Sequence, residues 1–215
     1  MIISTIGLSP QVPAGDLQAV HGLVLQAALA GEPHRPVLWA QPGPRILVIR
    51  HDRAVTTTDL PPGLAEHVTH SPYWLPPAGA AVDWAVTVDA SVCGQTRNQW
   101  AARNALNLTR GKGRRAEPKP SRIRTPEQVL DVVTARLSGA GLDVPAARAA
   151  SRRHRIGHRP REGRTLHSNQ VTVRGAGTVT DAAALHDLMV RGIGRNKSFG
   201  CGLMFARPAT VAAPC

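Results

Sequence analysis

One histidine and a few basic segments are the parts of this sequence that could do acid–base chemistry or bind an anion. His21 lies five residues after Asp16, in a stretch where Leu17, Val20 and Val24 have the spacing of a helix. A positioned imidazole is the usual general acid or base near neutral pH. A lone histidine at helical spacing is also often a packed or surface residue, so both interpretations remain open from this feature alone.

The second candidate is a glycine-rich run at residues 192–202 (GIGRNKSFGCG). A Walker A loop ending at Lys197 would need glycine where Arg191 and Asn196 stand, and the run follows a predicted helix, so nucleotide binding is excluded. Backbone N–H groups of such a run, with Arg195 and Lys197, can approach an RNA phosphate closely. A tight turn into the last strand is the alternative.

The charge of the chain is unevenly distributed. Its 215 residues include 26 Lys or Arg and 14 Asp or Glu, a formal net charge of +12. Residues 1–96 have a formal net charge of −3, and residues 97–215 have a formal net charge of +15. Codon usage can explain why 23 of the basic residues are arginine. It does not explain the asymmetry, for which nucleic acid is the usual partner.

Two segments concentrate the positive charge: residues 110–115, predicted as an exposed turn, and residues 148–164, predicted as a basic loop or hairpin. A solvated charged loop is the alternative. Because aromatic residues make up only 3% and neither phenylalanine falls on a predicted central strand, we expect binding of folded or helical RNA through phosphates and groove edges. The predicted RNA contacts are Arg110, Lys112, Arg114, Arg115, Arg152, Arg153, Arg155, Arg159, Arg161, Arg195 and Lys197.

Other site types lack support. The three cysteines form no CxxC pair, and no HExxH, GxSxG or other ligand spacing occurs. The longest apolar stretch, residues 23–30, is interrupted by Gln26, and no basic residue precedes Arg35. We therefore expect a cytoplasmic protein without a metal site, a small-molecule cofactor or a membrane partner.

The elements that must position these residues follow a recognisable order. In the first half the pattern predicts a helix that Asp16 caps. In the second half, residues 125–128 form a capping box before a helix, and Gly192 ends another. Strands are predicted at residues 1–8, 45–50, 68–70, 82–92, 98–108, 165–174, 177–180 and 203–206, with a tight link at residues 175–177.

The order strand–helix–strand–strand–helix–strand is that of the ferredoxin-like split βαβ unit. The first half has the same order if its second helix is degraded. The prediction is an α+β protein of two tandem ferredoxin-like (RRM-like) domains. Residues 1–92 would form the N-terminal domain with His21, and residues 97–215 the C-terminal domain with the basic and glycine-rich loops.

Three groups of residues together resemble a known family. They are His21 in the first helix, residues 107–109 with the following basic turn and residues 124–129 (RTPEQV), and residues 175–180 leading to residues 192–203 (GIGRNKSFGCGL). This combination resembles the CRISPR type I-E repeat-processing endoribonuclease, the CasE subunit of Cascade. The resemblance is densest from residue 97 onward, whereas residues 31–90 match only in layout.

The resemblance implies two ferredoxin-like domains that bind the hairpin of the CRISPR repeat transcript. It also implies metal-independent cleavage at the 3′ base of the stem, after which the protein stays on the crRNA with the other Cascade subunits. The family's catalytic histidine falls on His21, which would take the proton of the attacking 2′-OH or give one to the leaving 5′-oxygen. The products would be a 2′,3′-cyclic phosphate and a 5′-OH.

Gln18 stands where several family members have tyrosine. As a predicted RNA contact it can hydrogen-bond a phosphate oxygen, but it cannot exchange a proton. Lys197, Arg195 or the segment 152–161 would then stabilise the charge of the phosphorane. Two alternatives remain: a non-catalytic RNA-binding subunit of a CRISPR ribonucleoprotein, and a general basic nucleic-acid-binding protein.

Overall fold

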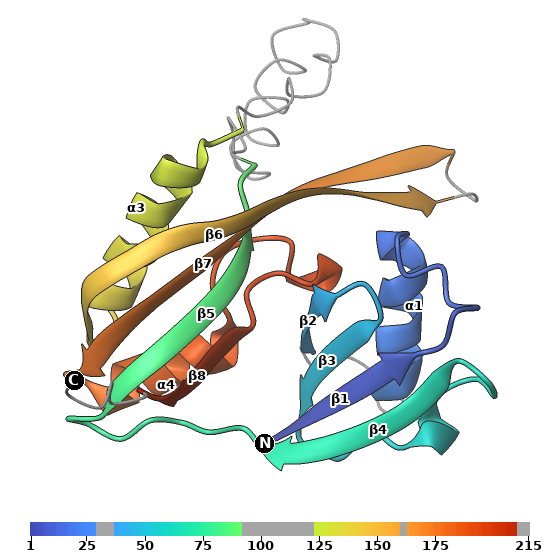
Figure 1. The fold of residues 1–215 in the computed structure, drawn as a ribbon, viewed down its shortest axis with the longest axis horizontal. Coiled ribbons are helices and arrows are strands. Elements are labelled where there is room, and N and C mark those ends of the chain that lie inside the picture. The colour runs from blue at the N-terminus through green and yellow to red at the C-terminus, as the bar shows by residue number, and fades with distance from the viewer. Residues whose placement is uncertain (29–36, 92–122, 160–162, 210–215) are drawn as a thin grey trace, which may run out of the picture.

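The chain folds into two four-stranded antiparallel sheets, as a computed structural model shows (Figure 1). The structure describes residues 1–28, 37–91, 123–159 and 163–209. The strand orders are β2-β3-β1-β4 and β6-β7-β5-β8. In the first sheet the strands are β1 (Ile2–Leu8), β2 (Leu38–Gly43), β3 (Ile46–His51) and β4 (Ala65–Pro72). In the second they are β5 (Ala81–Asp89), β6 (Leu142–Arg159), β7 (Arg164–Val179) and β8 (Met204–Pro208).

One helix, α1 (Leu17–Ala28), packs on the first sheet. Its start is fixed as predicted, because Asp16 Oδ1 accepts hydrogen bonds from the backbone N–H of Gln18 at 2.7 Å and of Ala19 at 3.3 Å. Between β3 and β4, where a ferredoxin-like unit has its second helix, stands only the 3₁₀ turn Thr57–Asp59. The predicted degraded helix is therefore confirmed.

Two helices cover one face of the second sheet: α3 (Pro126–Ser138) and α4 (Ala182–Arg191). The predicted capping box starts α3, with the Gln128 N–H donating to Thr125 Oγ1 at 3.3 Å and the Thr125 N–H donating to Gln128 Oε1 at 3.1 Å. Gly192 ends α4 with a φ of 75°. The α+β class with two ferredoxin-like units is confirmed.

The strand prediction was wrong in one place and incomplete in two others. The predicted turn at residues 175–177 does not exist, since β7 runs without a break and residues 170–178, which include this segment, pair with β5. A Cβ at Gly175 would lie 2.5 Å from the Ala146 carbonyl oxygen, so this glycine permits a close approach between strands rather than a turn. Strand β2 was not predicted. Strand β6 was not predicted as a strand either, since only residues 148–164 were expected to form a basic loop or hairpin. The predicted strand at residues 98–108 lies outside the described residues.

The sheet pairing also bears on the division into domains. Residues 81–89 form β5, which pairs with β7 and β8 of the second sheet. Sequence reasoning had assigned these residues to the end of an N-terminal domain at residues 1–92. Because a central strand belongs to the sheet in which it pairs, we propose that the boundary lies at residues 73–80, between β4 and β5.

Arg50 joins the two units. This β3 residue is buried, and its guanidinium donates to the carbonyl oxygens of Met189 at 3.0 Å and Val190 at 2.7 Å, near the C-terminus of α4. It also lies 5.5 Å from the ring centre of Tyr73, whose hydroxyl donates to the Met204 carbonyl oxygen at 2.9 Å. A cation at a helix C-terminus satisfies carbonyls that lack a helical partner. The first sheet is thereby docked on the second unit.

Candidate functional site

His21 lies against the glycine-rich run. Its side chain is half-buried on α1 with Nδ1 buried, and its ring centre is 5.5 Å from that of Phe199, at an interplanar angle of 55°. Phe199 ends the 3₁₀ turn Lys197–Phe199 inside the run. Two segments that the sequence analysis singled out separately therefore meet in one place.

Both sheets hold the glycine-rich run in position. Trp39 Nε1 of β2 donates to the Ser198 carbonyl oxygen at 3.2 Å, and Gln170 Nε2 of β7 donates to the Phe199 carbonyl oxygen at 2.8 Å. Gly200 has a φ of 77°, and a Cβ there would lie 2.9 Å from the Trp39 ring. Only glycine fits this backbone conformation and this close approach without strain. The glycine-rich run therefore has a fixed backbone conformation beside His21.

The predicted basic loop at residues 148–164 is a hairpin formed by the outer parts of β6 and β7, whose end reaches beyond the second sheet toward α1 (Figure 1). Asp16 Oδ1, the cap of α1, also accepts from the His158 N–H at 3.3 Å. A Cβ at Gly157 would lie 3.0 Å from the Gln18 nitrogen and 3.2 Å from Leu17 Cβ. The hairpin therefore packs directly on the first turn of the helix that carries His21.

Arg155, a predicted RNA contact, makes internal contacts in the structure. Its guanidinium donates to Gln41 Oε1 and, at 2.6 Å, to the Ala14 carbonyl oxygen. Gln41 Nε2 donates to the same carbonyl oxygen at 3.1 Å. Burial, and secondly the charge of Arg153, lowers the pKa of Arg155. This side chain fastens the hairpin to the chain just before α1.

The remaining predicted contacts are distributed around this centre. Arg152 and Arg153 are exposed on β6, and Arg195 is exposed in the glycine-rich run. Lys197 Nζ donates to the Arg191 carbonyl oxygen at 2.5 Å, and burial is the largest cause that lowers its pKa. The side chain of Arg159 is not described, and Arg110, Lys112, Arg114, Arg115 and Arg161 lie outside the described residues.

Sequence reasoning missed two aromatic features of the site. Phe199 was given no role of its own within the glycine-rich run, and nothing in a single sequence indicates that it contacts His21. His154 and His167 stack at 5.3 Å on the exposed hairpin, with a 3.2 Å contact between His167 Nδ1 and His154 Nε2. Alternation on two paired strands could have placed them on one face, but β6, which carries His154, was not predicted as a strand.

Within the described ranges, no three His, Cys, Asp or Glu side chains lie close enough together to hold a metal ion. Cys201 is buried, and burial raises the pKa of its thiol to about 12. None of the described helices is long and apolar enough to cross a membrane.

Comparison with known proteins adds a family and a fold. A family model described as "CRISPR associated protein" matches residues 3–208. No curated protein sequence matches the chain significantly. The solved structure of CRISPR endoribonuclease Cse3 bound to a 19-nucleotide RNA is similar with a TM-score of 0.72 and 18% identity, over 97% of this chain and 100% of that one.

Two further structures are similar to nearly the same extent. Thermus thermophilus Cse3, bound to an RNA that represents a pre-cleavage complex, has a TM-score of 0.71 and 17% identity over 96% of this chain and 98% of its own. Cas6e from Escherichia coli K-12 has a TM-score of 0.68 and 17% identity over 97% of this chain and 100% of its own. At these identities the likeness shows a shared fold.

Proposed function

We propose that this chain, which belongs to the CRISPR associated protein family, is an endoribonuclease that cleaves the repeat hairpin of CRISPR transcripts. The observation that carries the proposal is the meeting of His21, the glycine-rich run and the basic hairpin at the first turns of α1. The structures of similar fold include an endoribonuclease bound to RNA, which supports the same activity here.

In the proposed reaction the 2′-OH of one nucleotide attacks the adjacent phosphorus. The 2′-oxygen loses its proton and forms a P–O bond. The bond to the 5′-oxygen of the next nucleotide breaks and that oxygen gains a proton, so the products are a 2′,3′-cyclic phosphate and a 5′-OH. No metal takes part. Because Nδ1 of His21 is buried, we assign the proton transfer to Nε2. A positioned imidazole supplies about 10²–10⁴-fold acceleration, enough for an enzyme that turns over once.

Basic side chains are expected to stabilise the charge of the phosphorane. Arg195 is exposed in the glycine-rich run, and Arg152 and Arg153 are exposed on the hairpin, so all three side chains are accessible to RNA. Lys197 would first have to leave the Arg191 carbonyl oxygen. Gln18, at the contact between α1 and β6, would bind a phosphate oxygen.

The proposed partners are the CRISPR repeat hairpin, the crRNA that remains after cleavage, and the other Cascade subunits. A CRISPR RNA-guided surveillance complex contains a chain of the same fold, with a TM-score of 0.65 and 14% identity over 97% of this chain. We also propose that the protein acts in the cytoplasm, together with these partners.

A second candidate is a non-catalytic RNA-binding subunit of a CRISPR ribonucleoprotein. The half-burial of His21 against Phe199 favours it, since an aromatic contact of this kind can be purely structural. In that case affinity for the hairpin would be the whole function, and no RNA product would form.

The test is incubation of the protein with the CRISPR repeat hairpin in EDTA, followed by analysis of the RNA ends. We expect one cut, a 2′,3′-cyclic phosphate and a 5′-OH. A 2′-deoxy nucleotide at the cut site should abolish the reaction. Cleavage that requires Mg²⁺, or that tolerates the 2′-deoxy substitution, would refute the mechanism, and tight binding without any product would favour the second candidate.

A further inference from the structure

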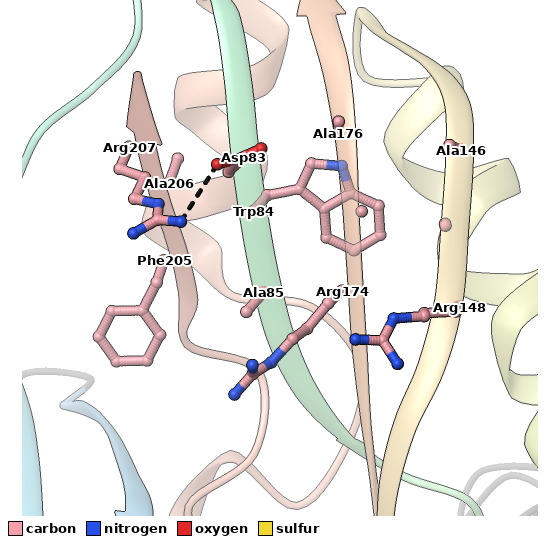
Figure 2. A pocket seen from close by; sticks show the side chains of 12 residues that line it. Asp83, Trp84, Ala85, Ala146, Arg148, Arg174, Ala176, Phe205, Ala206 and Arg207 are labelled. Carbon is pink, nitrogen blue, oxygen red and sulfur yellow. Dashed lines mark hydrogen bonds and ion pairs between the residues drawn. The ribbon is translucent and has the colours of Figure 1, made fainter. Parts of the chain in front are cut away.

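One face of the second sheet is covered by none of the helices that the structure describes. Because side chains alternate along a strand, Thr172 and Arg174 of β7 lie on the face opposite α3 and α4. Toward one end, the glycine-rich run covers this face through the hydrogen bond of Gln170 to Phe199. Toward the other end the face is hollowed, with a volume of about 630 Å³ (Figure 2).

The hollow carries unbalanced positive charge. Arg148 and Arg174 are both exposed and directly opposite each other in the pairing of β6 with β7. Like charges opposite each other destabilise a sheet. Of the acids within the described residues, none forms an ion pair with either side chain, while Asp83 is already paired with Arg207 at 3.2 Å. An anion in the hollow would remove this repulsion.

The floor and one side of the hollow are apolar. Ala85, Ala146 and Ala176 leave room above the strands, and the half-buried ring of Phe205 lies beside them on β8. Figure 2 shows the Arg174 side chain extending from β7 toward the side of the sheet where Phe205 stands. An aromatic ring beside arginines on an open sheet face is suited to stacking a base while binding its phosphate. A peptide would match the aromatic ring but not two unpaired arginines unless it were acidic.

The hollow and the candidate active site share one sheet face. Arg174 and Gln170 are four residues apart on β7, about 13 Å along the strand. Gln170 holds the Phe199 carbonyl oxygen, and the Phe199 ring faces His21. A nucleic-acid strand that leaves the vicinity of the glycine-rich run can therefore continue over this face.

We propose that this hollow binds single-stranded RNA that flanks the hairpin in the same transcript. The proposal rests on the proposed function for the identity of the RNA. Arg148 and Arg174 bind phosphates, and Phe205 stacks on a base. Base stacking on a sheet was disfavoured from the sequence, because aromatic residues make up only 3% and neither phenylalanine falls on a predicted central strand. Phe205 lies on β8, which is an edge strand.

The experiment compares three RNAs on the full chain by equilibrium binding: the repeat hairpin alone, the hairpin with a 5′ extension, and the hairpin with a 3′ extension. Each extension has about ten nucleotides, within the range that one such domain covers. The variants are Arg148→Ala with Arg174→Ala, and Phe205→Leu, which keeps an apolar side chain for folding. Arg191→Ala is the matched control, because Arg191 is an exposed arginine on α4, across the sheet.

We expect one extension to tighten binding by about fivefold or more. The arginine and phenylalanine variants should lose that gain, and the double variant should flatten the salt dependence by about 0.7 per lost phosphate contact. The control should keep the gain. Affinity for the hairpin alone should not change in any variant.

The proposal is overturned if neither extension tightens binding, or if the gain persists in the variants. A loss of Cascade-subunit binding with an unchanged RNA gain would assign the face to a protein partner instead. The experiment measures binding and not cleavage. If an extension tightens binding but the RNA is never cut, the proposed nuclease activity is contradicted and the proposed binding of flanking RNA is still supported.

Discussion

The rings of His21 and Phe199 lie 5.5 Å apart, although one belongs to a helix on the first sheet and the other to the loop that follows α4 of the second unit. The candidate active site therefore exists only while the two units are docked. Arg50, buried and bound to the C-terminus of α4, supplies one of the contacts that hold them together. The first predictions concern the supports of His21.

Phe199→Ala removes the ring that packs on His21. We expect single-turnover cleavage of the hairpin to slow by about 10- to 100-fold, because a displaced catalytic group loses its alignment. Hairpin affinity should change little, since the substitution removes no charge. Phe199→Leu keeps part of the contact, so its cleavage rate should lie between those of the wild type and Phe199→Ala. Unchanged cleavage by Phe199→Ala would show that this ring does not position His21.

Gly157→Val tests the contact between the hairpin and α1. The new side chain would meet the Gln18 backbone and the Leu17 side chain, which already lie 3.0 and 3.2 Å from a Cβ at this position. We expect slower cleavage and a lower melting temperature. Gly15→Ala is the matched control, because nothing lies within 4 Å of its Cβ position. Equal behaviour of the two variants would mean that the hairpin does not set the position of the helix.

The arginines of β6 should divide into two groups. Replacing Arg152 and Arg153, both exposed, with alanine should flatten the salt dependence of hairpin binding by about 0.9 per lost phosphate contact, without loss of stability. Arg155→Ala should instead lower the melting temperature, because the Ala14 carbonyl oxygen and Gln41 lose a charged donor. A salt titration and a thermal melt on each variant separate the two effects. A salt slope that falls only with Arg155→Ala would reverse the assignment.

Asp59 links the end of α1 to the turn after β3. Its hydrogen bond from Arg53 is the largest cause that lowers the pKa of Asp59 to about 2, and Arg53 also donates to the Ala27 carbonyl oxygen at 3.0 Å. A carboxylate whose pKa is depressed on folding stabilises the protein above its unfolded pKa of about 4. We expect Asp59→Asn to be less stable at pH 7, by less than about 1 kcal/mol, because the Arg53 side chain is 41% exposed and water screens the pair. The difference should shrink as the pH falls through about 2 and vanish below it. A difference that persists below that pH would rule out the ion pair as its source.

Local patterns predicted much of the fold. Asp16, Thr125 and Gly192 act through neighbours within a few residues, so the helix ends could be read from the sequence. Gly175 was misread because a glycine that permits close approach of two strands looks, in one sequence, like a glycine in a turn. The same ambiguity concealed the length of β7.

The site could be predicted only in its parts. His21 and the glycine-rich run were found by residue type, but their contact depends on the docking of two sheets, which no local pattern encodes. Arg155 shows the opposite failure: its charge suggested RNA, whereas its position gives it the Ala14 carbonyl oxygen and Gln41 as partners. Composition cannot distinguish an arginine that binds a ligand from one that makes hydrogen bonds within the protein.

The central claim is that His21 carries out proton transfer, and the most direct measurement is hairpin cleavage in EDTA by the wild type and by His21→Ala, with hairpin affinity measured in parallel. Gln26→Ala, an exposed change on the same helix, is the control. The account predicts that His21→Ala binds the hairpin as the wild type does and cleaves it at least about 100-fold more slowly, while the control does both normally. Cleavage by His21→Ala at the wild-type rate would contradict the account, as would a wild type that binds the hairpin and never cuts it.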